Sequence, residues 1–156
     1  MKNNPFSLSF GKEPVSLINR NVQSYEIIDT FEDENPTYQV CMITGVRGSG
    51  KTVMLTEINK TFRAEEDWIV IDLSPERDLL QSFAANLSNY PSLSEVFREA
   101  KINLSFLGLG VEIEGVSPIT DLNVAVTRML EKIKKKHKRV LVTIDEAGWN
   151  DSMEEF

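Results

Sequence analysis

Three runs of mostly apolar residues stand out along the chain, at residues 38–44, 68–73 and 139–144. A strand that is covered on both faces carries such a continuous run, whereas a half-exposed strand alternates apolar and polar positions. The three runs therefore predict three buried strands. Strands of this kind belong to a mostly parallel sheet with helices packed on its faces.

Before and between these runs, apolar residues recur every three to four positions, which is the spacing of an amphipathic helix. Helices are predicted over residues 21–32, 53–62, 78–87, 93–101 and 121–138. In the first helix, the predicted buried face consists of Val22, Tyr25, Ile28 and Phe31. Strands that alternate with helices predict an α/β fold with one core, which suits a chain of 156 residues.

Two segments depart from this alternation. Residues 1–20 hold two prolines and a glycine among scattered apolar residues, which favours an extended arm lying over the core. Residues 102–114 alternate apolar and polar positions on either side of two glycines, which predicts a β-hairpin. We therefore expect an arm followed by an α/β core over residues 21–156.

The first apolar run leads into a glycine-rich segment that fits the pattern G-x-x-x-x-G-K-[ST] at every constrained position. A predicted strand precedes this segment and a predicted helix follows it, which is the context that the pattern requires. The segment is therefore interpreted as a P-loop, a phosphate-binding turn. The residues expected to contact the nucleotide are Gly45, Val46, Arg47, Gly48, Ser49, Gly50, Lys51, Thr52 and Val53.

The residue types in this segment suit a triphosphate. Glycines allow the backbone to bring its N–H groups close to phosphate oxygens, and the helix that follows adds unpaired N–H groups and a favourable dipole. Lys51 is expected to reach the β- and γ-phosphates of ATP, and the hydroxyl of Thr52 to ligate Mg²⁺.

The third apolar run ends in Asp145 and Glu146, which is the pattern of a Walker B segment. An acid behind an apolar strand is common, but its position downstream of a P-loop strengthens the interpretation. Asp145 is expected to hold the Mg²⁺ shell, and Glu146 to orient or deprotonate the water that attacks the γ-phosphate. Glu146 and Lys51 are thus the candidate catalytic residues.

Charge and composition narrow the classes of function. A formal net charge of −7 argues against a general nucleic-acid binder, although residues 132–139 form a local basic stretch. The single cysteine, Cys41, lies in a predicted strand, where we expect it to be buried filler. The sequence has no membrane-length apolar run and no secretory signal, so a cytoplasmic location without membrane contact is expected.

With both motifs placed, the chain resembles the N-terminal part of AAA+-type P-loop ATPases, close to the origin-recognition and archaeal-type ATPases. The matching residues are Asn4, Pro5, Phe6, Phe10, Gly11, Lys12, Arg20 and the blocks 44–57 and 141–146. The resemblance implies a three-layer P-loop NTPase fold and an Mg²⁺-dependent ATPase.

In that family a sensor strand, an arginine finger and a helical lid follow the Walker B segment. The resemblance therefore implies that residues 1–156 are the N-terminal portion of an ATPase domain that is incomplete at its C-terminus. We accordingly expect weak nucleotide binding and little turnover from these residues alone, with ATP hydrolysis belonging to a longer protein.

The leading functional hypothesis is an ATP-driven molecular switch that binds ATP and ADP. ATP is favoured over GTP because no Asn-Lys-x-Asp-type segment is present, and the acidic pair favours an activated water over a phosphoryl acceptor. Two alternatives stay open, namely a nucleotide-regulated DNA-binding protein and a catalytically silent nucleotide-binding scaffold. The sequence does not decide whether the partner is another protein, a second copy of the chain, or DNA bound through C-terminal regions.

Overall fold

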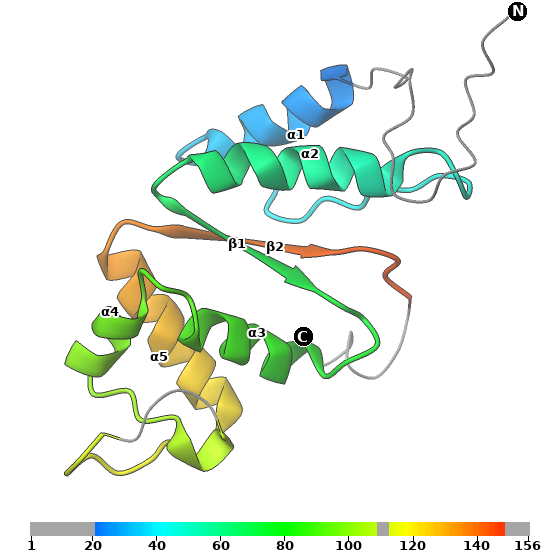
Figure 1. Ribbon diagram of the computed structural model, residues 1–156. Coiled ribbons are helices and arrows are strands. Elements are labelled where there is room, and N and C mark those ends of the chain that lie inside the picture. The colour runs from blue at the N-terminus through cyan, green and yellow to red at the C-terminus, as the bar shows by residue number, and fades with distance from the viewer. Residues whose placement is uncertain (1–20, 109–112, 149–156) are drawn as a thin grey trace, which may run out of the picture. The chain divides into compact units, whose positions relative to one another are not determined.

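The computed structural model describes residues 21–108 and 113–148, which fall into two compact units that divide inside a helix, after Met54 (Figure 1). Each unit is described by itself. The predicted arm over residues 1–20 lies outside the described residues. Within the described ranges, none of the helices has the length and apolar character needed to cross a bilayer.

The first unit contains helix α1 (Asn21–Glu32), which confirms the first predicted helix. Its predicted buried face is wrong at two positions, because Val22 and Tyr25 are 79% and 59% exposed, whereas Ile28 is buried as predicted. The buried positions are Ser24, Ile27 and Ile28, which lie at i, i+3 and i+4 on one helical stripe. Because the polar Ser24 lies on this stripe, the sequence pattern favoured a neighbouring stripe with more apolar residues.

The predicted strand over residues 38–44 is wrong, because this segment has no regular secondary structure. Val40 and Met42 are 85% and 84% exposed, and the prediction that Cys41 is buried is also wrong. Phe31 and Tyr38 make an edge-to-face ring contact at 6.0 Å within this unit. An apolar run forms a strand only when a neighbouring strand pairs with its backbone, so apolar character alone does not make this segment a strand.

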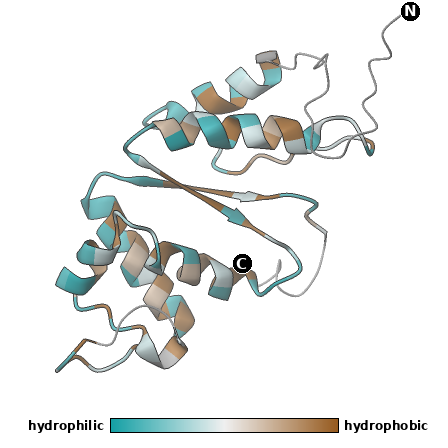
Figure 2. Ribbon diagram, viewed as in Figure 1, coloured by the Kyte–Doolittle hydropathy of each residue, from teal (hydrophilic) through white to brown (hydrophobic). Residues whose placement is uncertain are grey.

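The second unit is built on the parallel strands β1 (Trp68–Leu73) and β2 (Arg139–Ile144). Their register runs from Trp68 opposite Arg139 to Leu73 opposite Ile144. These strands confirm the second and third predicted strands and the parallel pairing. Both are mostly hydrophobic along their length (Figure 2).

Four predicted helices are confirmed as α2 (Lys51–Ala64), α3 (Leu79–Ser88), α4 (Ser94–Glu99) and α5 (Leu122–Lys135). The helices α3 and α5 begin where an aspartate accepts a hydrogen bond from a backbone N–H of the first turn. Asp78 accepts from Gln81 at 2.7 Å, and Asp121 accepts from Val124 at 3.1 Å. These caps fix the starts of two helices that pack on the sheet.

The main core of the second unit lies between one face of the sheet and α3, α4 and α5, which share one side of the strands (Figure 1). Alternate residues of β1 point into it, because successive side chains of a strand face opposite ways. The core includes Ile69, Ile71, Leu73, Leu79, Phe83, Leu87, Phe97, Val126, Met129 and Ile133.

The opposite face of the sheet is covered by the part of α2 from Leu55 onward. Phe62 of α2 packs against Trp68 of β1 with ring centroids 4.4 Å apart. Because both faces of the parallel strands are covered by helices, this unit is compatible with an α/β P-loop fold.

The predicted hairpin over residues 102–114 is wrong in its described part. Residues 109–112 lie outside the described residues, and the segment before them ends in a 3₁₀ turn, η1 (Ser105–Leu107). Asn103 is 1% exposed, and its side chain bonds to backbone groups of Ser105 at 3.1 Å and Val116 at 2.8 Å. A buried asparagine thus satisfies loop backbone groups that a hairpin ladder would otherwise pair.

Candidate functional site

The P-loop in the first unit has a backbone that requires glycine. Gly48 and Gly50 have φ angles of 78° and 84°, in the region that side-chain-bearing residues rarely adopt. A Cβ atom at Gly45 would lie 2.8 Å from Ser49 Oγ, so a side chain at this position would require the Ser49 hydroxyl to move. The spacing of the three glycines in the motif therefore reflects the shape of the turn.

Lys51 folds back across the loop that precedes it. Its Nζ donates to the carbonyl oxygens of Gly45 at 2.9 Å and Val46 at 3.2 Å. The backbone N–H of Ser49 donates to Val46 O at 3.2 Å, and that of Met54 to Gly50 O at 3.0 Å, where α2 begins. The loop, the ammonium group and the start of the helix therefore form one locally bonded structure.

This loop fits an anionic ligand by the chemistry of its polar groups. Ser49 Oγ is buried and has no hydrogen-bond partner within residues 21–108 and 113–148. A buried hydroxyl without a partner is uncommon and is satisfied when an acceptor oxygen arrives. The first N–H groups of α2, the Lys51 ammonium and this hydroxyl are all donors, which matches the oxygen-rich surface of a phosphate.

The acidic half of the predicted site lies in the second unit. β2 ends at Ile144, and the half-buried Asp145 follows, with its Oδ1 accepting the backbone N–H of Glu146 at 2.9 Å. Glu146 is exposed and has a φ of 55°, an uncommon conformation for a residue with a side chain. Asp145 and the Thr52 hydroxyl are hard oxygen ligands of the kind that Mg²⁺ prefers.

The structure thus describes the two halves of the predicted site separately. Residues 45–53 belong to the first unit, where Thr52 and Val53 are exposed at the start of α2. Asp145 and Glu146 belong to the second unit, at the carboxyl end of β2. It stays a prediction that the two halves act on one nucleotide.

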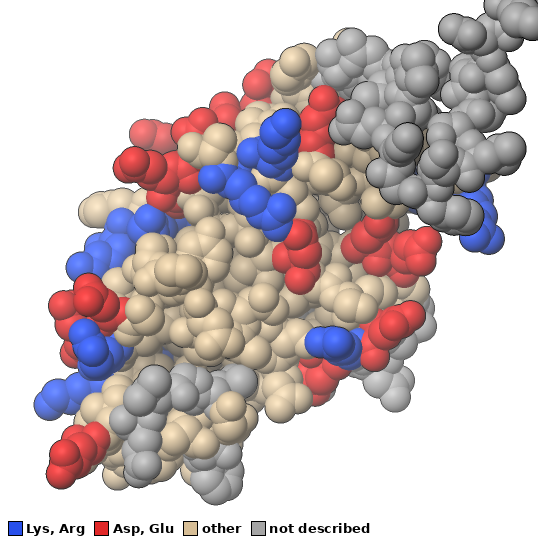
Figure 3. Space-filling view, in the orientation of Figure 1, with Lys and Arg blue, Asp and Glu red and all other residues tan. Residues whose placement is uncertain are grey.

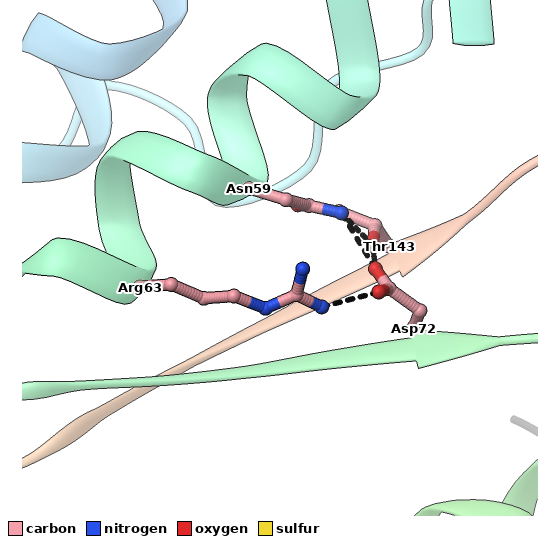
Figure 4. A network of polar contacts seen from close by, with 4 residues as sticks. All are labelled: Asn59, Arg63, Asp72 and Thr143. Carbon is pink, nitrogen blue, oxygen red and sulfur yellow. Dashed lines mark hydrogen bonds and ion pairs between the residues drawn. The ribbon is translucent and has the colours of Figure 1, made fainter.

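A polar network in the second unit was missed by the sequence analysis (Figure 4). Asn59 of α2 donates from Nδ2 to Asp72 Oδ1 at 2.5 Å and to Thr143 Oγ1 at 2.9 Å. The Thr143 hydroxyl donates to the same Asp72 oxygen at 2.5 Å, and Arg63 forms an ion pair with Asp72 Oδ2. The sequence feature that could have pointed to this network is Asp72, a carboxylate inside the apolar run 68–73.

Part of the basic stretch at residues 132–139 makes contacts inside the second unit. Lys138 donates to the backbone oxygen of Glu66 at 2.7 Å, and Arg139 lies 4.2 Å from the centroid of the Trp68 ring. Over α4 and α5, basic side chains are interspersed with acidic ones on the face that Figure 3 shows. A role of the exposed lysines 134–136 in DNA contact stays a prediction.

Comparison with known proteins places the chain in a family. No curated protein and no solved structure matches it at a significant level. The family model described as "AAA ATPase domain" matches residues 17–155, which is most of the chain and includes the P-loop and Asp145. The narrower resemblance to origin-recognition and archaeal-type ATPases stays a prediction. Because this match covers most of its residues, the chain belongs to the AAA ATPase domain family.

Proposed function

We propose that this chain binds ATP with Mg²⁺ and acts as a nucleotide switch that is reset by ATP hydrolysis. The observation that carries the proposal is the local structure of the P-loop. Its ammonium group, the start of α2 and the buried Ser49 hydroxyl, which has no partner in the part of the chain that the structure describes, supply donors to one short loop of a chain in the AAA ATPase domain family. Such a concentration of donors favours a polyanion.

Binding of the phosphates requires Lys51 to exchange partners. Its Nζ is held by the carbonyl oxygens of Gly45 and Val46, which are neutral acceptors. Those bonds are charge-assisted on the donor side only, whereas a phosphate oxygen adds the attraction between opposite charges. The ammonium group therefore gains by turning toward the β- and γ-phosphates, while the backbone N–H groups of the loop hold the β-phosphate.

The remaining roles concern the metal and the water. Thr52 and Asp145 would hold Mg²⁺, which supplies charge neutralisation at the β- and γ-phosphates when bound. Glu146 is the candidate base that orients or deprotonates the attacking water. Its exposure leaves the carboxylate accessible to a water molecule.

The role as a switch follows from the same parts. Loss of the γ-phosphate removes a ligand of Lys51 and of the metal shell, so the surrounding segments lose contacts that order them. A partner that contacts those segments would bind the two nucleotide states with different affinity. The identity of that partner is left to experiment.

Nucleotide binding is tested by thermal unfolding of residues 1–156 with ATP or ADP and Mg²⁺. We expect the wild type to be stabilised, by about 2.7 kcal/mol at a ligand concentration of 100 times the dissociation constant. Lys51→Ala should lose this stabilisation. Lys60→Ala, which removes an exposed lysine from the same helix, should keep it. A wild type that no nucleotide stabilises, or a Lys51→Ala variant that responds like it, would contradict the proposal.

Hydrolysis of ATP is tested separately, with a form of the protein in which ATP turnover can be measured. Glu146→Gln should bind ATP with unchanged affinity and lose turnover, because the carboxylate acts only in the chemical step. Equal kcat in Glu146→Gln and wild type would remove Glu146 from the mechanism. Nucleotide binding without turnover in any form of the protein would instead favour the silent scaffold.

A further inference from the structure

The network of Asn59, Asp72 and Thr143 lies inside the second unit, between α2 and the sheet. Asp72 and Thr143 are direct neighbours in the parallel register and are the last-but-one residues of β1 and β2. Both side chains face α2, because Asn59 contacts each of them. The network therefore lies near the carboxyl end of the strands, the edge at which open α/β sheets bind ligands.

The network has a buried part and an exposed part. Asn59 and Thr143 are 4% and 7% exposed, whereas the side chains of Asp72 and Arg63 are about half exposed. Ile58 and Phe62 of the same helix are also buried, so α2 has apolar contacts to hold it without Asn59. The buried amide adds a directional bond to a packing surface that is otherwise apolar.

Asn59 is poorly explained by stability alone. Its Oδ1 is buried and has no hydrogen-bond partner in the described part of the chain. A buried acceptor without a partner carries a desolvation cost, which offsets most of what the donor side of the amide contributes. An apolar residue of similar volume would remove this cost. The amide is therefore better explained by the geometry that its two donor bonds impose.

The geometry bears on Asp145. Thr143 stands two residues before Asp145, a separation of about 7 Å along a strand. We propose that the bond from Asn59 to Thr143, held together by Asp72, is a positioning contact that fixes the end of β2 and thereby orients Asp145 toward Mg²⁺. This inference rests on the proposed function. Asn59 and Thr143 are positioning residues, since neither is assigned a contact with nucleotide or metal.

The test measures how strongly Mg²⁺ and ADP are coupled. The dissociation constant of ADP is measured by calorimetry with Mg²⁺ and again with EDTA, and the ratio of the two constants is the coupling. Loss of an outer-shell partner typically lowers metal affinity by about 10–100-fold. We expect Asn59→Leu and Thr143→Val each to lower the coupling by about tenfold, which is the lower end of that range. The affinity for ADP in EDTA should be unchanged.

Matched variants separate positioning from general damage. Thr143→Ser keeps the hydroxyl and should keep the wild-type coupling. Arg63→Gln removes the exposed partner of the same carboxylate and should also keep the coupling, because Arg63 pairs with Asp72 Oδ2, whereas Asn59 and Thr143 bond to Oδ1 (Figure 4). Urea unfolding should show Asn59→Leu to be about as stable as the wild type, because the two lost donor bonds are offset by removal of an acceptor that has no partner among the described residues.

The outcomes distinguish the inference from the proposed function. Wild-type protein that binds no ADP with Mg²⁺ would overturn both. Wild-type protein with strong coupling that Asn59→Leu and Thr143→Val leave intact would overturn the positioning contact alone. Equal loss of ADP affinity with Mg²⁺ and with EDTA would also overturn it, because the effect would then lie in the fold or the P-loop.

Discussion

The P-loop and the sheet are held by contacts of very different range along the chain. Lys51 bonds to carbonyl oxygens only five and six residues away. The hydrogen bond between Asp72 and Thr143 instead joins residues 71 positions apart. The turn that is proposed to bind phosphate is therefore defined by its own residues, whereas the strand that leads into Asp145 depends on a distant partner.

The same contrast explains why similar apolar runs behave differently. Residues 68–73 and 139–144 pair with each other and are covered by helices. Residues 38–44 have comparable apolar character, yet Val40 and Met42 are exposed. Apolar character supplies a reason for burial, but pairing partners decide whether a strand forms. Four sets of substitutions test this contrast between the two regions.

The largest effect is expected from matched methionine truncations in the two regions. Met129 is 0% exposed in the core of the second unit, and Met42 is 84% exposed in the first. Met129→Ala should lower the free energy of unfolding by about 2–5 kcal/mol, because it leaves a cavity. Met42→Ala should change it by less than about 0.5 kcal/mol. Urea denaturation measures both, and a large loss in Met42→Ala would contradict the exposed placement of residues 38–44.

The next effect concerns glycines with positive φ in the two regions. Gly50 in the P-loop and Gly108 in the second unit have φ angles of 84° and 68°, with open space where a Cβ would lie. Alanine at either position should cost about 1–2 kcal/mol in backbone strain. Only Gly50→Ala should also weaken ADP binding, as measured by calorimetry. Equal ADP affinity in both variants would argue that the shape of the loop does not matter for binding.

A smaller effect is expected at a local contact inside the second unit. Asp121 caps α5 through the N–H of Val124 at 3.1 Å. Asp121→Ala should lower the free energy of unfolding by about 1 kcal/mol, whereas Asp121→Asn should retain most of the cap. Thermal or urea unfolding of the two variants checks this. A neutral alanine variant would show that long-range packing alone holds the start of α5.

The smallest effect is expected at the exposed pair of Arg98 and Glu95, whose charged atoms are 3.7 Å apart on α4. Glu95→Gln should change the free energy of unfolding by less than about 0.5 kcal/mol, because exposed pairs are screened and contribute little. The same urea measurement applies. A loss as large as that of Asp121→Ala would indicate that surface charge contributes more to the second unit than its packing suggests.

Much of the local structure could be predicted from the sequence. The helical spacing located five helices, and the carboxylates Asp78 and Asp121 precede two of them as caps. The P-loop pattern predicted where the glycines relieve a strained turn, which Gly48 and Gly50 confirm by their φ angles. Each of these features depends on residues within a few positions of one another, so the local pattern contains the physical cause.

The burial of particular side chains could not be predicted in the same way. Ser24 is buried while Val22 is exposed. Where a hairpin was predicted, the structure has a loop in which the side chain of Asn103 bonds to backbone groups. Asn59, Asp72 and Thr143 gave no pattern that linked them. Which groups meet is decided by the packing of distant segments, and a local sequence window does not contain that information.

The sequence alone predicted a phosphate-binding turn ahead of a helix, and an apolar strand followed by two acids. The helix and the strand are confirmed, and phosphate binding stays a prediction. The tertiary structure added the register of β1 against β2, the irregular backbone of residues 38–44, and the buried amide that joins α2 to Thr143. The reason is physical. Turns and helices are specified by neighbouring residues, whereas strand pairing and buried polar contacts need segments that the chain brings together only when it folds.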